Sequence, residues 1–252
     1  MSTRVVAIDV GNTRLKWGVH DGVGWQARGV METGHIAADT SLRAAVESAD
    51  IGKIQVSNVA GVAVAAALRE HLAHALCPPV FIRAQKTQCG VTNHYQHGAA
   101  LGSDRWAALI SAHLASAHAP RAQLVVMAGT ALTIDALTAD GQFLGGVIVP
   151  GPALMLAALN KATAQLPAAD GGFQWFPQNT ADALTSGARL AGAGAICLMH
   201  RQLSERVGAT PHCVAAGGGF NLLAPHLPFP VAINDNLVLE GVIAIARDGV
   251  GG

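Results

Sequence analysis

Two short stretches, placed half a chain apart, read alike, and this repetition limits the folds open to the chain. The first, "VVAIDVGNTRLKWGV" at 5–19, runs through apolar residues to Asp9, turns at Gly11 and returns as a second strand. The second, "QLVVMAGTALTIDALT" at 123–138, has the same form. A shift of 118 residues places Gly11 on Gly129 and Asp9 on Met127. Such self-similarity predicts a duplicated domain.

Length and charge fit this expectation. With about 150 residues per domain as the prior, a chain of 252 residues predicts one large domain or two modest ones. Its 16 basic side chains balance 16 acidic ones, so no net field favours nucleic acid as a partner. Because 51% of the residues are hydrophobic and 13% are charged, we expect a second subunit to cover some apolar surface, in a homodimer.

Cysteine spacing and hydropathy indicate the compartment. The four cysteines show no C-x-x-C pair, so we expect free thiols: Cys77, Cys89, Cys197 and Cys213. An extended segment begins within five residues of the N-terminus and leaves no room for a signal peptide. No apolar run reaches the roughly 18 to 20 residues of a membrane span. We therefore expect a cytoplasmic protein without a membrane partner.

Strands and helices alternate along the first half. Further strands are expected at Leu15–Val19 and 53–60, and Ala-rich helices at Ser41–Ser48 and Val62–Leu76. Ser103 and Asp104 are capping candidates for a longer helix that ends near Pro120.

The first hairpin carries groups suited to a nucleotide phosphate. Asp9, at the end of a strand, is placed to hold hydrated Mg²⁺, and the Gly11, Asn12 and Thr13 amides can face phosphate oxygens. Lys16 adds a compensating positive charge. The alternative is an ordinary Gly-Asn hairpin turn with no ligand.

Two later turns extend the pattern. Gly129 permits close backbone approach, and the Thr130 amide and hydroxyl can donate to an anion. Near the C-terminus, "HCVAAGGGFNLL" passes through Gly217–Gly219 into a helix start, where a base and ribose could lie flat. Tight packing alone is the competing explanation for these glycines.

Two phosphate turns followed by a Gly-rich turn is the order found in the actin-like ATPase and sugar-kinase superfamily. The stretches "DVGNTRLKWG", "YQHGAALGSDRW", "AGTALTID" and "GGVIVPG" together resemble type III pantothenate kinases over residues 9 to about 187. The resemblance implies an α/β fold of two ribonuclease-H-like domains, each a mixed sheet flanked by helices, at 1–119 and 120–252.

The resemblance also implies an activity and a site. The activity is the ATP-dependent phosphorylation of pantothenate, the first step of coenzyme A synthesis, by a homodimer with Mg²⁺. The implied ATP-binding residues are Asp9, Val10, Gly11, Asn12, Thr13, Arg14, Leu15, Lys16 and Thr130. The implied pantothenate-binding residues are Tyr95, Gly102, Ser103, Asp104, Arg105 and, from the neighbouring subunit, Thr180.

Asp104 matches the catalytic base of this family. A primary alcohol is a poor nucleophile, and a carboxylate within hydrogen-bond reach can accept its proton during phosphoryl transfer. Each assignment keeps a structural alternative. Asp104 could cap the helix, Arg105 could be a surface cation, and Tyr95, the one tyrosine, could be a core residue. Asp135 could be structural or line the nucleotide site.

One position departs from the family pattern. Where these kinases usually carry an aspartate that contributes to a site for K⁺ or NH₄⁺, this chain has Met127, and a thioether is a poor ligand for such ions. Other oxygens could suffice, the enzyme could work without the ion, or its activity could be weakened.

Three other functions compete with the leading one: kinase of another small alcohol, accessory regulator of gene expression with residual nucleotide binding, and nucleotide-binding structural protein. Neutral charge and the lack of a recognisable DNA-reading helix count against the regulator.

Overall fold

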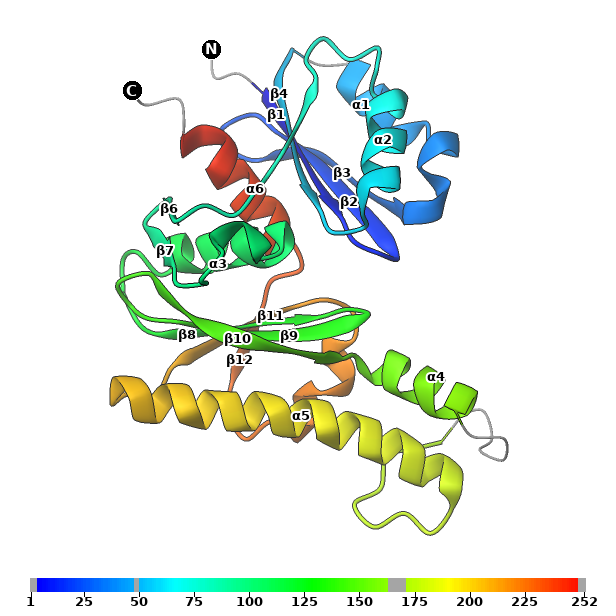
Figure 1. Ribbon diagram of the computed structural model, residues 1–252, viewed down its shortest axis with the longest axis vertical. Helices are drawn as coiled ribbons and strands as arrows, with labels where there is room; N and C mark the ends of the chain where they lie inside the picture. Colours follow the sequence, from blue (N-terminus) through cyan, green and yellow to red (C-terminus); the bar gives the residue numbers. More distant parts are fainter. Residues whose placement is uncertain (1–3, 48–49, 163–170, 249–252) are drawn as a thin grey trace. The chain divides into compact units, whose positions relative to one another are not determined.

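The computed structural model describes residues 4–47, 50–162 and 171–248 (Figure 1). The chain divides into two compact units, the first made of Met1–His118 with Asn236–Gly252 and the second of Ala119–Asp235. The boundary after residue 118 lies within one residue of the predicted one. The C-terminal segment differs from the prediction, because it packs with the first unit although it follows the second in sequence.

The first unit is built on a five-stranded sheet in the order β3-β2-β1-β4-β5. Strands β1, β2 and β3 form an antiparallel meander, and β4 and β5 run parallel to β1. The strands are β1 Arg4–Val10, β2 Arg14–His20, β3 Trp25–Glu32, β4 Ile51–Asn58 and β5 Pro79–Phe81. β1 is buried along almost its whole length, as a central strand covered on both faces should be.

Short helices complete the hydrophobic core of this sheet. They are η1 Thr33–Ala38, α1 Ser41–Glu47 and α2 Val62–His71. Leu42 of α1 and Leu68 of α2 are fully buried in one cluster with Ile8 and Val56. Both helices were expected, although residue 48 lies outside the described residues. The second ends at His71 rather than Leu76, and Leu72 is its C-cap.

Helix α3 (Ser103–Ala115) packs against α6 (Leu237–Asp248), which also contacts β1. A Cβ on Gly241 of α6 would lie 1.9 Å from the Ala107 carbonyl oxygen, so glycine is required for this close approach. The N-cap of α3 is Gly102 and no side chain caps it, which corrects the capping role expected of Ser103 and Asp104. The helix also ends at Ala115, five residues before the predicted Pro120.

A small hairpin precedes α3. It joins β6 (Thr87–Gln88) to β7 (Val91–Asn93) through Cys89 and Gly90, whose φ values of 49° and 81° suit a type I′ turn. The Trp106 indole of α3 donates to the Gln88 side chain at 3.0 Å. This hydrogen bond holds the β6–β7 hairpin against α3. The loop between β7 and α3 contains the short helix η2 Gly98–Ala100.

The second unit repeats the topology of the first. Its strands follow the order β12-β11-β8-β9-β10, with β8, β9 and β10 antiparallel and β11 and β12 parallel to β8. The strands are β8 Gln123–Ala128, β9 Ala131–Leu137, β10 Gln142–Pro150, β11 His212–Ala216 and β12 Val231–Ile233. Each strand thus corresponds in order and direction to one of β1–β5.

One long helix lies along this second sheet. Helix α5 (Thr180–Val207) runs across one face of it, and α4 (Pro152–Ala162) contacts both β10 and α5 (Figure 1). Leu132, Ile134 and Ile196 are fully buried in the core between α5 and the sheet. The prediction of a helix start after Gly217–Gly219 is wrong. The segment forms two short 3₁₀ helices instead, η3 Phe220–Leu222 and η4 Ala224–His226.

Backbone hydrogen bonds also repeat at the duplicated positions. The Val59 amide, just after β4, donates to the Val10 carbonyl at 3.0 Å, and the Gly219 amide, after β11, donates to the Ala128 carbonyl at 3.0 Å. Val10 and Ala128 are separated by the 118 residues that relate the two hairpins in sequence. The repetition seen in the sequence is therefore a repetition of structure.

The four cysteines are free, as the sequence predicted. Along the described part of the chain, no helix combines the length and apolar character needed to cross a membrane.

Candidate active site

A row of three polar side chains crosses the first sheet at the carboxyl end of β1. Asp9 lies opposite Lys16 of β2 and opposite Ser57 of β4 in the strand register. Residues directly opposite one another in neighbouring strands point to the same face of a sheet. The hairpin fold of β1 and β2, together with the parallel return of β4, therefore gathers a carboxylate, an ammonium and a hydroxyl at one place.

The carboxylate of Asp9 is held in an unusual electrostatic state. Burial raises its pKa to about 7, and the negative charge of Asp104 adds to the rise, while Lys16 and a hydrogen bond from Ser57 oppose it. Asp9 Oδ1 is enclosed and has no hydrogen-bond partner among the described residues. An oxygen left in this way suits a cation that is not part of the chain.

The donor set around Asp9 fits Mg²⁺ bound together with a phosphate. No group of three or more His, Cys, Asp or Glu side chains that could hold a metal ion occurs within 4–47, 50–162 and 171–248. Mg²⁺ often relies on one or two protein carboxylates and takes its remaining ligands from water and substrate phosphates. Asp9, with its orphaned oxygen, supplies such a carboxylate.

Asp104 lies in the first turn of α3, close enough to Asp9 for the two charges to interact. Burial raises its pKa, while hydrogen bonding to the Arg105 amide and the charge of Arg105 lower it. The hydrogen bond from the Arg105 backbone amide to Asp104 Oδ1 measures 2.7 Å. A Cβ on Gly102 would lie 2.7 Å from Asp104 Oδ1, so the glycine leaves room for this carboxylate.

Two buried hydroxyls, those of Ser57 and Ser103, lie beside Asp9. Ser103 Oγ accepts from the Asn58 amide at 3.0 Å and lies 3.1 Å from Ser57 Oγ. Ser57 also forms a side-chain hydrogen bond with Asp9. A chain of hydrogen bonds therefore links the β4 backbone at Asn58, through Ser103 and Ser57, to the Asp9 carboxyl group.

Tyr95 and Arg105 form a pair beside Asp104. The Arg105 guanidinium is 5% exposed, and its Nη1 donates to the Tyr95 hydroxyl at 3.1 Å. The guanidinium carbon also lies 5.8 Å from the centre of the Tyr95 ring. Arg105 is therefore not the surface cation of the alternative interpretation. Half-buried Tyr95 is not a core residue either.

Thr33, which the sequence analysis missed, fastens the turn between β1 and β2. Its hydroxyl donates to the Gly11 carbonyl at 2.7 Å, and its amide donates to the Thr13 carbonyl at 3.0 Å. The Gly11 amide itself bonds across the turn to the Arg14 carbonyl at 3.0 Å. Asn12 and Thr13 are exposed, so their side chains form the outer surface of this turn.

The predicted ATP-binding residues do not all present their side chains to a ligand. Val10 and Leu15 are fully buried members of the sheet core, so any contact from them has to come from the backbone. Asn12, Thr13 and Arg14 are exposed, and Lys16 is half-buried.

The corresponding turn of the second unit is also tightly built. The Gly129 amide bonds to the Ala131 carbonyl at 3.0 Å, and the Gly151 amide bonds to the Thr130 carbonyl at 2.9 Å. Gly217 has a φ of 99°, and a Cβ there would lie 2.4 Å from the Ala128 carbonyl oxygen. The Thr130 turn and the Gly217–Gly219 turn are therefore neighbours, joined through Ala128.

Two other predicted positions lie in this unit. Thr180 is an exposed residue at the start of α5, after the N-cap Asn179, whose side chain accepts from the Asp182 amide. Asp135, left open between two roles, is fully buried in β9.

The row that holds Asp9 in the first unit has an apolar counterpart in the second. Met127 lies opposite Thr133 of β9 and opposite Ala216 of β11. This row offers one hydroxyl and one thioether, a donor set that does not fit K⁺ or NH₄⁺, which prefer several oxygen ligands. The two units thus share the strand positions, but only the first has a carboxylate, that of Asp9, in this row.

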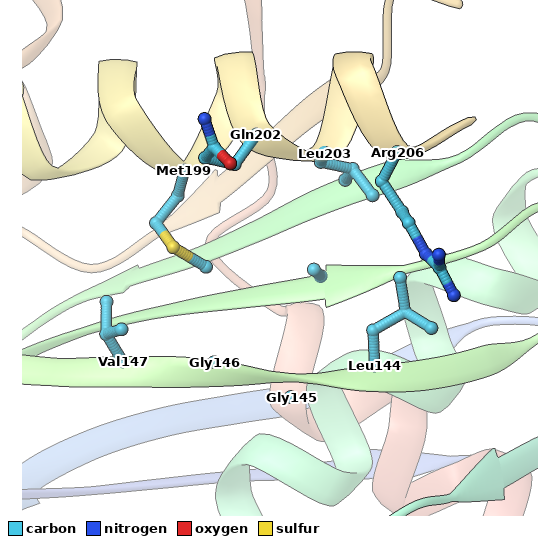
Figure 2. A pocket seen from close by; sticks show the side chains of 9 residues that line it. Leu144, Gly145, Gly146, Val147, Met199, Gln202, Leu203 and Arg206 are labelled. Carbon is cyan, nitrogen blue, oxygen red and sulfur yellow. The ribbon is translucent and has the colours of Figure 1, made fainter. Parts of the chain in front are cut away.

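A separate groove of about 430 Å³ lies in the second unit. Figure 2 shows Met199, Gln202, Leu203 and Arg206 of α5 above the strand that carries Leu144 and Val147. The hollow exists because Gly145 and Gly146 of β10 have no side chains. None of the site residues predicted from the sequence lines it.

Comparison with known proteins defines the class and then the family. The structure resembles a protein described as a Baf family transcriptional activator from Campylobacter jejuni, with a TM-score of 0.61, 21% identity and coverage of 98% of this chain and 100% of that one. It also resembles a protein described as a 2-dehydro-3-deoxygalactonokinase from Sinorhizobium meliloti, with a TM-score of 0.58, 16% identity and coverage of 98% and 97%. These likenesses show the fold alone, mixed sheets flanked by helices as predicted.

Sequence comparison is more specific. The model of the type III pantothenate kinase family matches residues 5–202. Type III pantothenate kinases from Nitrosospira multiformis and Aromatoleum aromaticum are 43% and 44% identical, over 98% and 97% of this chain and 93% and 98% of their own lengths. The chain belongs to the type III pantothenate kinase family, which confirms the resemblance drawn from its motifs.

The raised pKa of Asp9 predicts how stability depends on pH. The folded pKa of about 7 exceeds the value of about 3.9 for an unfolded aspartate. The native state therefore binds a proton that the unfolded chain has released, and this stabilisation, complete below pH 4, is lost as pH rises to 7. Asp9→Asn should exceed the wild type in free energy of unfolding at pH 8 by about 2 kcal/mol, roughly half the full linkage value because the side chain is partly exposed.

Urea unfolding in EDTA, without nucleotide, measures this difference. At pH 4.5 the difference should shrink to about a quarter of its value at pH 8, because the folded side chain at position 9 is then neutral in both proteins. An advantage of Asp9→Asn that is the same at both pH values would contradict the assignment.

Proposed function

We propose that this protein transfers the γ-phosphoryl group of ATP to the primary hydroxyl of pantothenate, the step that begins coenzyme A synthesis. One observation carries the proposal. Two half-buried carboxylates, Asp9 and Asp104, lie close together beside a glycine turn and Lys16, in a chain that belongs to a family of pantothenate kinases. Phosphoryl transfer to an alcohol requires such a division, with one acid for the metal and one for the proton.

Asp104 is the proposed general base. As the acceptor oxygen forms its bond to the γ-phosphorus, the bond from that phosphorus to the bridging oxygen of ADP breaks, and Asp104 accepts the hydroxyl proton. A base works best when its pKa approaches the pH at which it operates, so the upward shift of the Asp104 pKa favours this role. The burial that causes the shift also keeps water from competing with the acceptor.

Asp9 and the first hairpin are proposed to bind the phosphates. Mg²⁺ held at Asp9 would neutralise charge on the β- and γ-phosphates. The serine chain keeps the paired oxygen of Asp9 fixed, which leaves Oδ1 to face the ion. Lys16 lies across the strand pair, where its charge partly compensates the two acids. That the Thr130 turn binds the same nucleotide stays a prediction from the sequence.

The proposed acceptor site consists of Tyr95, Ser103 and Arg105, with Gly102 providing space. A guanidinium suits the carboxylate of pantothenate, because it is permanently charged and presents several donors in a plane. Thr180 as a contact from a neighbouring subunit and the cytoplasmic location stay predictions. Because the Met127 row does not fit K⁺ or NH₄⁺, we assign no monovalent cation to it.

Kinase of another small alcohol is the remaining alternative. Such a kinase would use the same site residues and differ only in the alcohol that accepts the phosphoryl group. Rates of ADP release measured with pantothenate and with a panel of other alcohols distinguish the two activities. The gene-regulatory alternative has no residue-level support here, since a likeness at 21% identity carries the fold and not the activity.

Removal of the proposed base tests the function. Asp104→Asn keeps the shape of the side chain but cannot accept a proton, so kcat for pantothenate-dependent ADP release should fall by about 10²- to 10⁴-fold. The KM for ATP should stay within about twofold, because the nucleotide does not need this carboxylate to bind. Asp50→Asn, a substitution of an exposed aspartate, is the control and should keep full activity. Full turnover in Asp104→Asn would exclude the base.

We also propose a homodimer formed through the second unit. Seven of its exposed apolar side chains lie on β10, α4 and the segment before α5: Leu144, Val147, Ile148, Leu154, Leu159, Trp175 and Phe176. Ile148 is 61% exposed and Phe176 is 91% exposed. Apolar side chains in such number are costly in water, and a second copy of the chain would cover them. β10 and α4, which carry five of these residues, are in contact.

Light scattering during gel filtration measures the assembly. The wild type should have twice the chain mass of 25.7 kDa, and Ile148→Arg should shift it towards the monomer, because a buried unpaired charge opposes association. Val23→Arg, at a turn residue that is 96% exposed in the first unit, should leave the mass unchanged. A monomeric wild type at micromolar concentration would contradict the proposal.

A further inference from the structure

We propose that Asn93 is a positioning residue for the acceptor, which orders the loop that carries Tyr95 and thereby sets the affinity for pantothenate. The inference rests on the proposed function and adds to it a residue that neither the motifs nor the family resemblance singled out. Asn93 is the last residue of β7, ten residues before the start of α3, and it is completely buried.

Both ends of the Asn93 amide are bonded to the loop that follows. Its Oδ1 accepts from the Tyr95 backbone amide at 3.0 Å, and its Nδ2 donates to the Gly98 carbonyl at 3.0 Å. One side chain thus closes the loop at two points. Residues 94–97 belong to no helix or strand, so regular backbone pairing does not order them.

Asn93 is itself held in place by Lys86. Its backbone amide donates to the Lys86 carbonyl at 2.9 Å, and the Lys86 ammonium donates to the Asn93 carbonyl at 2.9 Å. The Asn93 backbone therefore has a fixed position at the base of the β6–β7 hairpin. Its side chain transmits that position to the loop.

The consequence for the acceptor site passes through Tyr95. The Tyr95 hydroxyl accepts from buried Arg105, which is adjacent to Asp104 in α3. If the Tyr95 backbone is fixed by Asn93 and its hydroxyl by Arg105, the ring has little freedom at either end. Preorganisation of this kind lowers the entropy cost of binding without adding a contact to the ligand.

Asparagine meets the chemical requirement where close relatives of its side chain do not. The site needs an acceptor towards Tyr95 and a donor towards Gly98, and both must come from one buried planar group. Aspartate keeps the acceptor and places a second oxygen against the Gly98 carbonyl. Serine keeps one short acceptor for the amide two residues later and leaves the Gly98 carbonyl without its partner.

Steady-state kinetics of Asn93→Ala tests the inference. The KM for pantothenate should rise about tenfold, the order expected from two lost hydrogen bonds, while the KM for ATP should stay within about twofold, because the Asn93 side chain bonds to the loop that carries Tyr95 and Gly98. Asp21→Ala is the matched control. The Asp21 carboxylate also accepts from two loop amides, those of Val23 and Gly24, but its turn carries no site residue. This control should change neither KM.

Hydrogen–deuterium exchange supplies a readout that does not depend on turnover. Exchange in peptides covering 94–102 should accelerate in Asn93→Ala and stay unchanged in Asp21→Ala. Asn93→Ser, which keeps one of the two bonds, should fall between wild type and Asn93→Ala in both measurements and covers the case in which the alanine variant does not fold.

The outcomes separate the two levels of the argument. Faster exchange with an unchanged pantothenate KM would overturn the positioning role and leave the proposed function intact. Unchanged exchange would overturn the account of the loop. A wild-type protein that turns over no pantothenate would contradict the proposed function, whatever the exchange shows. An equal rise in both KM values would indicate general loosening and would also overturn the inference.

Discussion

The structure of the site depends on the burial that raises the pKa of two neighbouring carboxylates. Asp9 and Asp104 are brought together by separate parts of the first unit, one at the end of the central strand and one in the first turn of a helix. Neither acid is fully compensated by the chain, because Lys16 and Arg105 oppose the effect of burial without cancelling it. The hydroxyls of Ser57 and Ser103 form a hydrogen-bonded chain that reaches Asp9, and the surrounding fold has to offset the cost of burying both acids.

Duplication explains how one topology came to carry two different turns. Both sheets have the same strand order, and the chain leaves β4 and β11 through equivalent hydrogen bonds. The row across the central strand is nevertheless charged in one copy and apolar in the other, where Met127 and Ala216 stand at the positions of Asp9 and Ser57. The first copy therefore carries the carboxylate row that the proposed function uses, while the second carries backbone turns and an apolar row.

The sequence revealed what is local in this site and missed what depends on contacts between distant segments. The hairpin around Gly11, the acid at Asp9 and the Asp104–Arg105 pair stand in continuous motifs, so their residues could be named in advance. Thr33 and Ser57 could not, because each reaches the site through a fold that brings separate strands together. The same reason hid the packing of α6 against α3, where Gly241 meets Ala107 across more than a hundred residues of sequence. A polar Ser-Asn pair at the end of an apolar strand was the one available signal for Ser57.

The coupling between Asp9 and Asp104 is the central claim, and carboxyl-carbon NMR of aspartate-labelled protein in the absence of Mg²⁺ and nucleotide tests it most directly. Asp9 should titrate near pH 7 in the wild type. Its pKa should fall measurably when Asp104→Asn removes the neighbouring negative charge, and it should stay above the ordinary range because burial remains. An Asp9 pKa that does not respond to this substitution would mean that the two acids do not share one site, and the account of the active site would be wrong.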